Sequence, residues 1–396
     1  MTLSDEQLAA AQSSADIPLL ILAGPGSGKT TTLVHRISYL SPSLSSNESI
    51  LLLTFSKSAV HEMSSRLSMH SILEAQCHVF TFHSFALRII KAHHVQAGYL
   101  KPPRVMTLKD RLELLRGCIS NLRSIDVTQS QDDKRVLSET LRFISEIKRS
   151  TDPGKTLEDY KDSYKELFYS YQRRLIETNR LEFEDMVPTA LKMLRHHSQL
   201  LSHYQRLYRY VLCDEFQDTN TYQRQMLLLL GASGRITAVG DMNQLIYAFQ
   251  GADVNNFKCF KSYFKATHAV SVMSLSRNFR SSGPIVYFCN TLIDESSEDL
   301  PATSMVPLKD REEGCKVEIV ECLGSSDSEL QFLTNKIMEL LRDKRVNEAS
   351  DMAILCRTND SVQRVGRFIR ERCSGIQVTL SLTADDEGNN PASMNY

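Results

Sequence analysis

The chain has 396 residues, 42% of them hydrophobic, which is enough for roughly two or three domains that each bury a core. The 46 lysines and arginines nearly balance the 47 aspartates and glutamates, which excludes a protein that is basic over its whole surface. A local basic groove for nucleic acid is compatible with this balance. Nine scattered cysteines without a Cys-x-x-Cys pair, and no signal-peptide or membrane-spanning pattern, predict an intracellular protein without a membrane partner.

The first hundred residues alternate apolar runs with helical segments. Apolar runs at 19–23, 50–55 and 78–82 are each followed by a segment with helical character. Continuous apolar strands that alternate with helices predict a parallel sheet covered on both faces. From residue 101 to 197 the pattern is helical and charge-rich, which predicts a helical insertion.

Apolar runs at 210–213 and 236–239 predict two further strands of the same sheet. We therefore expect a first α/β domain made of residues 1–100 and 198–270.

The remaining sequence predicts the start of a second α/β domain at residues 271–378. Strands are expected within 269–275, where the chain crosses between the domains, and at 316–322 and 352–356. The polar residues 379–396 predict a disordered tail.

A glycine-rich loop joins the first strand to the first long helix. It consists of Ala23, Gly24, Pro25, Gly26, Ser27, Gly28, Lys29 and Thr30. This is the context of a Walker A loop, in which backbone N–H groups and a helix N-terminus bind phosphate. Lys29 would reach the β- and γ-phosphates of ATP, and the Thr30 hydroxyl would bind Mg²⁺. The alternative is a glycine-rich turn without a ligand, but the register of Lys29 and Thr30 favours the phosphate loop.

Two adjacent carboxylates follow the apolar run at 210–213. Asp214 is expected to hold Mg²⁺, and Glu215 is expected to orient and deprotonate the attacking water. The alternative is that both residues only cap the next helix, where acidic residues are favoured. The phosphate loop makes the catalytic interpretation the stronger one.

Residues 214–220, Asp-Glu-Phe-Gln-Asp-Thr-Asn, resemble the DEFQDTN motif of superfamily 1 DNA helicases of the UvrD/Rep type. Other segments resemble further motifs in the family's order. They are 3–7 (Q motif), 53–59 (motif Ia), 81–85 (the next DNA-contacting motif), 181–186 (an LDFDDLL-like stretch), 239–252 (motif III), 278–281 (motif IV) and 353–357 (a strand of the second motor domain). The resemblance implies a P-loop RecA-like parallel sheet with an inserted helical domain and the start of a second RecA-like domain.

The resemblance also implies roles at the ATP site. Gln7 would read adenine, Phe279 would stack on it, and Gln244 and Arg280 would contact the γ-phosphate. Thr31 stands where relatives often carry an arginine that packs on adenine, which implies looser adenine binding. The expected catalytic residues are Lys29, Asp214, Glu215, Gln244 and Arg280, and the expected cofactors are ATP and Mg²⁺.

Five residues match positions that contact single-stranded DNA in the family: Phe55, Lys57, His83, Tyr247 and Phe249. Each has a plainer interpretation. By its position alone, Phe55 is more typical of a core residue. Lys57 could equally lie on a solvated face. His83 fits a hydrogen-bond donor to phosphate and a buried histidine equally well. Tyr247 and Phe249 share one face of an extended segment, which fits either a base platform or internal packing.

Departures from the family pattern define the alternatives. Residues 242–243 are Met-Asn where relatives usually have acidic residues, and Gln250 replaces a usual arginine. After 375–378 the sequence leaves the pattern, and motifs V and VI are not recognised, which predicts a C-terminally truncated motor.

The resulting hypothesis is an ATP-dependent 3′-to-5′ helicase or translocase in DNA repair or recombination. A helicase that acts on chromosomal DNA would be nuclear in a eukaryote and cytoplasmic in a bacterium. Its partner would be single-stranded DNA or a duplex with a 3′ single-stranded tail. One alternative is a regulatory fragment that binds ATP and single-stranded DNA without hydrolysis. A more distant one is the helicase part of a RecB/AddA-like helicase–nuclease, for which no nuclease carboxylate cluster is seen.

Overall fold

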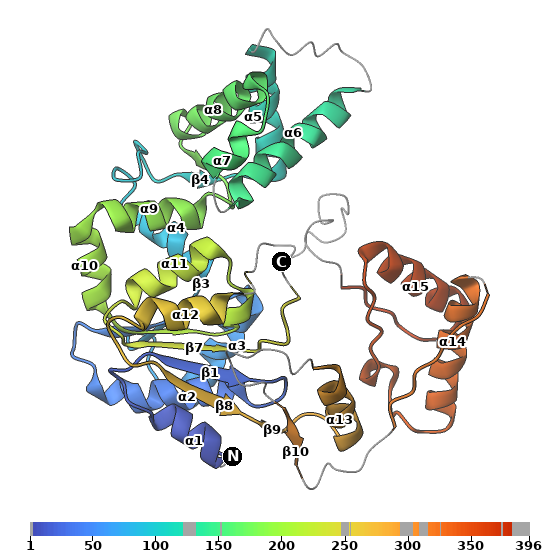
Figure 1. The fold of residues 1–396 in the computed structure, drawn as a ribbon. Coiled ribbons are helices and arrows are strands. Elements are labelled where there is room, and N and C mark those ends of the chain that lie inside the picture. Colours follow the sequence, from blue (N-terminus) through green and yellow to red (C-terminus); the bar gives the residue numbers. More distant parts are fainter. Residues whose placement is uncertain are drawn as a thin grey trace. The chain divides into compact units, whose positions relative to one another are not determined.

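The computed structural model divides the chain into two units, Met1–Val317 and Glu318–Tyr396 (Figure 1). The structure describes residues 3–121, 132–150, 153–246, 253, 255–293, 304–308, 316–324, 326–373 and 375–381. No helix among these residues is long and apolar enough to cross a bilayer.

The first unit is built on a six-stranded sheet in the order β3-β2-β6-β7-β1-β8. Its strands are β1 (Leu19–Ala23), β2 (Ser49–Thr54), β3 (Cys77–Thr81), β6 (Tyr208–Cys213), β7 (Ile236–Gly240) and β8 (Ser271–Leu275). All neighbouring strands run parallel, which confirms the predicted α/β fold. Because parallel strands share one direction, their carboxyl ends meet at one edge, where the phosphate loop and the acidic residues begin.

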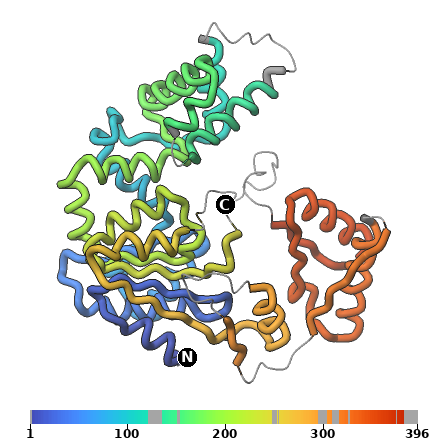
Figure 2. Tube along the Cα trace, viewed as in Figure 1, coloured from blue at the N-terminus to red at the C-terminus, as the bar shows by residue number. Residues whose placement is uncertain are grey.

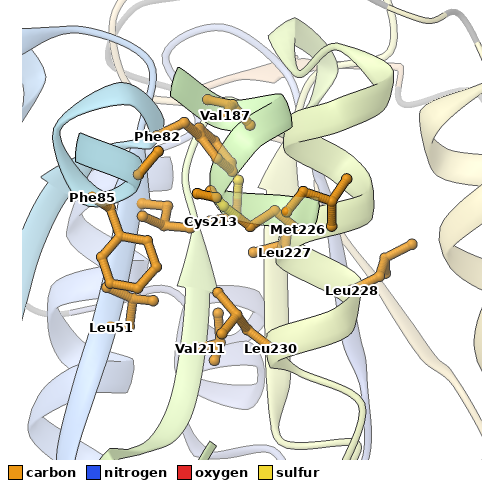
Figure 3. Packing of buried hydrophobic residues seen from close by; sticks show 14 of the residues in the cluster. Leu51, Phe82, Phe85, Val187, Val211, Cys213, Met226, Leu227, Leu228 and Leu230 are labelled. Carbon is orange, nitrogen blue, oxygen red and sulfur yellow. The ribbon is translucent and has the colours of Figure 1, made fainter. Parts of the chain in front are cut away.

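Helices cover both faces of this sheet. They are α1 (Asp5–Gln12), α2 (Lys29–Leu40), α3 (Lys57–Met69), α4 (Phe82–Ala92), α9 (Met186–His196), α10 (Ser198–Leu207), α11 (Thr221–Leu230) and α12 (Asn256–Phe264). Alternate residues of a strand enter opposite cores: Leu20 and Leu22 face α4 and α9–α12, whereas Leu19 and Ile21 face α1–α3. Figure 3 shows the first core, where Phe82 and Phe85 lie near Leu51 and Val211.

Strand β8 forms one edge of this sheet. Residues 271–275, which the sequence assigns to the second motor domain, pair in parallel with β1 from Leu19 to Ala23. This pairing satisfies the backbone groups on the outer side of the phosphate-loop strand. The strand therefore completes the first sheet. It is followed by β9 (Arg277–Asn278), α13 (Gly283–Leu292) and β10 (Val306–Pro307), where β10 pairs with β9.

The helical insertion has its own core. It contains β4 (Arg104–Val105), α5 (Leu108–Asn121), α6 (Asp132–Arg149), α7 (Pro153–Glu158), α8 (Asp162–Glu177) and β5 (Arg180–Leu181). Figure 2 traces the chain from α4 through these helices and back to α9. The core formed by residues 106–175 is separate from the sheet, but α9 packs into the core beside the sheet. Helix α9, which the prediction includes in the insertion at 101–197, has its apolar face buried against α4 and α11.

A buried ionic cluster joins the insertion to the segment that leads into α9. The Glu182 side chain is 0% exposed and accepts hydrogen bonds from Arg111 Nε at 2.6 Å and from Tyr171 Oη at 2.5 Å. Lys148 binds Glu182 and also Asp185, at 2.6 Å from its Oδ2. Burial alone would raise the pKa of Glu182, but Lys148 and Arg111 outweigh it and hold that pKa below its usual value. Three helices of the insertion are thus fixed to one carboxylate.

The second unit has a small core. Helices α14 (Ser326–Arg342) and α15 (Asn359–Arg372) pack around Leu330, Val365, Ile369 and Cys373. The described residues at 316–322 and 352–356 form no strand, contrary to expectation. Ile319 is 83% exposed and Leu355 is 95% exposed, so these apolar runs have no partner strand in the described part of the unit. Of the predicted tail, residues 382–396 lie outside the described residues.

Lys148→Met should lower the free energy of unfolding by about 3–5 kcal/mol, because it leaves the buried Glu182 and the half-buried Asp185 without their shared cation. Urea denaturation would measure the change. Glu139→Gln, which breaks the exposed Arg135–Glu139 pair on the same helix, is the control and should cost less than about 0.5 kcal/mol. Equal losses in the two variants would contradict a stabilising role for the cluster.

Candidate nucleotide and DNA site

The phosphate loop lies between β1 and α2, and two of its glycines have left-handed backbone angles. Gly26 has φ 72° and Gly28, the residue before α2, has φ 80°. A Cβ atom at Gly28 would lie 2.4 Å from Gln7 Nε2, and one at Gly26 would lie 2.7 Å from Arg280 Cβ. Both positions therefore require glycine, for the backbone angle and for the close approach of neighbouring segments. The N–H groups in the first turn of a helix point toward its N-terminus, which for α2 is the phosphate loop, and no side chain among the described residues caps them.

Two segments far apart in the sequence hold this loop in place. From the N-terminal helix, Gln7 Nε2 donates to the Ser27 carbonyl at 2.9 Å. From the segment after β8, Asn278 Nδ2 donates to the Pro25 carbonyl at 2.8 Å. The backbone N–H of Phe279 donates to the Gly26 carbonyl at 2.8 Å. The structure thus brings the Q-motif and motif IV residues to the phosphate loop.

Helix α1, which carries Gln7, is held by a buried arginine. Arg36 donates to the carbonyl oxygens of Ala10, in the last turn of α1, and of Ser13 and Ser14, just beyond it, at 3.1–3.2 Å. It also donates to Thr237 Oγ1 at 2.7 Å. These carbonyls have no partner within the helix, so the guanidinium satisfies them and fixes α1 against the sheet. Burial lowers the pKa of Arg36 to about 10, which still leaves it charged.

The acidic pair lies where β6 ends. Asp214 is buried, and its Oδ1 accepts the N–H of Glu215 at 3.0 Å. Lys29 Nζ lies 3.5 Å from Glu215 Oε2, which joins the phosphate loop to the acidic motif. Glu215 has φ 50° and ψ 49°, a left-handed conformation that is unfavourable for a residue with a side chain. Burial, assisted by the Glu215 charge, raises the pKa of Asp214.

Two further carboxylates lie close to this pair. Asp218 and Asp241 are buried, and within the described part of the chain Asp218 Oδ1 and Asp241 Oδ2 have no hydrogen-bond partner. Burial and the Glu215 charge raise the pKa of Asp218 to about 7, and burial also raises the pKa of Asp241. Lys29 opposes both shifts. Buried acceptors without donors are costly, which fits a site completed by a bound cation and its water ligands.

The residues present fit Mg²⁺ held together with a nucleotide. Among the described residues, no three histidine, cysteine or acidic side chains are grouped so that they could hold a metal ion. Mg²⁺ commonly takes only one or two protein ligands and completes its shell with phosphate and water oxygens. Thr30, at the start of α2, and Asp214 would be those ligands.

The turn after β7 carries the predicted γ-phosphate residue. Gln244 is half-buried, and its N–H donates to the Asp241 carbonyl at 3.2 Å. It therefore lies at the same sheet edge as Asp214. The predicted DNA-binding residues Tyr247 and Phe249 lie outside the described residues.

The other predicted DNA contacts follow β2 and β3, which are neighbours in the sheet. Phe55 is half-buried and lies outside both cores, and Lys57 is exposed in the first turn of α3. His83 stacks on Phe183, with ring centroids 3.8 Å apart and 18° between the planes. Burial lowers the pKa of His83 to about 4, so the ring is neutral at pH 7. The structure thus gives His83 an aromatic contact rather than the charge of a phosphate-binding cation.

Family models match most of the sequence. The model described as the UvrD/REP helicase N-terminal domain matches residues 3–265, and that of the UvrD-like helicase C-terminal domain matches residues 273–381. The chain belongs to the UvrD/REP helicase family.

Curated helicases of this family are similar over most of the chain. ATP-dependent DNA helicase PcrA of Staphylococcus aureus is 30% identical over 348 residues, which are 86% of this chain and 46% of that protein. PcrA of Bacillus subtilis is 31% identical over 354 residues, 87% of this chain and 46% of that protein. A probable DNA helicase II homolog of Rickettsia conorii is 31% identical, over 86% of this chain and 51% of that protein. The chain spans about half the length of these UvrD/REP relatives.

Several residues of this UvrD/REP site were not singled out from the sequence. They are Phe183, Gln217, Asp218, Asp241 and Asn278. Gln217 and Asp218 lie inside the acidic motif, and their polarity directly after a buried strand was an available signal. Phe183 is 54% exposed between two acidic residues, where an aromatic side chain is unusual.

Asp218→Asn should stabilise the nucleotide-free protein at neutral pH. The folded state holds the Asp218 proton up to about pH 7, whereas an ordinary aspartate loses it near 3.8. The contribution of Asp218 to stability is therefore complete below pH 3.8 and is lost as pH rises through 7. Melting temperatures in a magnesium chelator should show a gain of a few degrees at about pH 8 that shrinks toward pH 5. A gain that grows as pH falls would contradict the assignment.

Proposed function

We propose that this chain forms the ATP-binding part of a DNA helicase that moves 3′ to 5′ along single-stranded DNA. The observation that carries the proposal is the 3.5 Å approach of Lys29 Nζ to Glu215 Oε2, which places a phosphate-binding cation beside a candidate base. The similarity to PcrA supports the same activity. Such a protein acts where DNA is, inside the cell.

In this proposal Lys29 and the N–H groups at the start of α2 bind the phosphates of ATP. Glu215, fixed in its left-handed conformation, takes the proton from the attacking water. Arg280, next to Gly26, and Gln244, in the turn after β7, contact the γ-phosphate. Mg²⁺ bound at Thr30 and Asp214 would neutralise charge on the phosphate oxygens.

Adenine would lie near α1 and the start of motif IV. One amide hydrogen of Gln7 Nε2 donates to the Ser27 carbonyl at 2.9 Å, and the other would donate to the base. Phe279, whose N–H binds the loop, would provide the stacking face.

The DNA surface is proposed at the carboxyl ends of β2 and β3. Phe55, His83 and Phe183 present aromatic rings there, and stacking on bases does not depend on sequence. Lys57 adds a charge for the backbone, and Tyr247 and Phe249 are assigned to the same surface by resemblance. The regulatory-fragment and helicase–nuclease alternatives are not favoured, since the matching relatives carry the names of helicases.

ATP hydrolysis with and without a single-stranded oligonucleotide tests the proposal. DNA should stimulate turnover by the wild type. Lys29→Ala should lose nucleotide binding, whereas Glu215→Gln should bind ATP but turn over about 10²–10⁴-fold more slowly, because it loses the base. Lys165→Ala, at an exposed pair in the insertion, is the matched control and should behave as wild type. Wild-type turnover by Glu215→Gln would exclude this residue as the base.

Phe55→Ala should weaken binding of single-stranded DNA by about 1–3 kcal/mol, whatever the base sequence. Fluorescence anisotropy with a labelled oligothymidine and a mixed-sequence oligonucleotide would measure it. Tyr169→Ala, at an exposed aromatic of α8, is the control and should change affinity less than about twofold. If Phe55 belongs only to protein packing, its replacement will lower the melting temperature and leave DNA affinity unchanged.

A further inference from the structure

The amino-terminal edge of the six-stranded sheet lies opposite the phosphate loop, because all the strands run in the same direction. Basic residues gather at this edge. Arg209 is the second residue of β6, Arg235 comes directly before β7, and His268 lies in the turn between α12 and β8. None of these residues belongs to the nucleotide site or to the expected contacts with single-stranded DNA. They mark a surface that the proposed function does not use.

Two hollows on this edge have basic linings. One, of about 580 Å³, lies where β2, β6 and β7 begin. The other, of about 640 Å³, lies between α12 and the start of β8. Their arginines and lysines are Arg206, Arg209 and Arg235 in the first hollow and Lys258, Lys261 and Lys265 in the second. Among the described residues, the lining of the first hollow includes one carboxylate, Glu48, and that of the second includes none.

The lysines of the second hollow are arranged by the sequence of α12. The buried side of this helix is formed by phenylalanines that enter the core beside the sheet; they are Phe257, Phe260 and Phe264. Each of the three lysines stands one residue after one of these phenylalanines. Residues spaced three and four apart lie above one another on a helix, so the lysines form a row along one side of α12.

The two hollows belong to one surface, because the segments between them touch. Gly234, directly before Arg235, has φ 84°. A Cβ atom at Gly234 would lie 2.5 Å from His268 Cδ2. The start of β7 is therefore packed on the turn that leads into β8, and the arginines of the first hollow continue into the lysines of the second.

The carboxylates beside these hollows are already bound. Each accepts a hydrogen bond from an arginine of the first hollow, at 3.0 Å for Glu48 and at 2.8 Å for Asp16. Arg206 and Lys265 are exposed, and neither has an ion-pair partner within the described part of the chain. The surface therefore keeps an excess of positive charge, although the net charge of the whole chain is −1.

The composition of this surface fits a duplex better than a single strand. Among the described residues, no phenylalanine or tyrosine lines either hollow. Proteins bind single strands largely by stacking the bases on aromatic rings. A duplex encloses its bases and presents a dense, regular row of phosphates, which arginine and lysine bind whatever the sequence.

We propose that the amino-terminal edge of the sheet is a second nucleic-acid surface, which binds the phosphate backbone of duplex DNA. Arg206 and Lys265, one from each hollow, each bind a phosphate there. This inference goes beyond the proposed function, which assigns single-stranded DNA to the carboxyl ends of β2 and β3. The two surfaces lie at opposite edges of one sheet, so one chain can hold a single strand and a duplex segment at once.

The salt dependence of duplex binding tests this proposal. The affinity for a labelled, blunt-ended duplex of mixed sequence is measured by fluorescence anisotropy between about 50 and 200 mM salt. The logarithm of the affinity falls linearly with the logarithm of the salt concentration, with a slope of about −0.9 per phosphate contact. Arg206→Ala/Lys265→Ala removes two contacts. It should make the slope shallower by about 2 and weaken binding at least about tenfold at the lowest salt.

Two further variants isolate the contribution of the phosphate contacts. Arg206→Lys/Lys265→Arg keeps both charges and should retain the wild-type slope, because the contacts depend on charge. Lys165→Ala/Arg174→Ala, at two exposed ion pairs of α8, removes the same charge from the insertion and is the matched control. Its slope should equal that of the wild type. The affinity of every variant for single-stranded oligothymidine should stay within about twofold of the wild type, since stacking dominates there.

Several results would overturn the proposal. One is a wild-type chain that does not bind the blunt duplex, and another is an unchanged slope in Arg206→Ala/Lys265→Ala. An equal loss of affinity for oligothymidine would show that the two cations serve the single-strand surface instead. If the double variant loses binding of polyglutamate but keeps the duplex, the surface recognises an acidic polypeptide, and the assignment to DNA is wrong. None of these measurements requires ATP hydrolysis, so they stand apart from the test of the proposed function.

Discussion

The site depends on one geometric constraint, the closure of the phosphate loop between the end of β1 and the start of α2. This turn needs left-handed backbone at Gly26 and Gly28, and it exposes the N–H groups of α2 toward the space that a phosphate would fill. The glycines also allow Gln7 and Arg280 to approach within distances that any side chain would prevent. Segments from both ends of the first unit converge here because the loop leaves room for them.

The parallel sheet accounts for the rest of the convergence. Strands β1, β2, β6 and β7 end at the same edge of the sheet. The residues that follow them therefore lie at that edge, although they span more than half of the sequence; they are Lys29, Phe55, Asp214 and Gln244. The residues expected to bind nucleotide and those expected to bind DNA thus follow strands of one sheet. The ionic cluster at Glu182 has a similar role for the insertion, since it fixes three helices to the segment that carries Phe183.

The sheet and the phosphate loop could be predicted because they depend on local patterns: continuous apolar runs and glycines in a fixed register. Which strands pair with one another could not be predicted in this way. The apolar residues at 271–275 predict a strand, but only long-range pairing shows that its neighbour is β1. The runs at 316–322 and 352–356 have the same character and form no strand in the described residues. Likewise, the position of Gln217 inside a motif does not show that its amide oxygen accepts the N–H of Asp241, because this hydrogen bond joins the segments that follow β6 and β7.

The left-handed backbone of Glu215 has a consequence for how this protein could change. A non-glycine residue in this conformation stores about 1–3 kcal/mol of strain, and the buried acidic groups around it add electrostatic repulsion. Substitutions that relax the turn would make the protein more heat-resistant while removing the carboxylate proposed as the base. Engineering for thermostability alone would therefore select against the very residues that form the site, and stabilising changes should be sought in the helical insertion and the second unit.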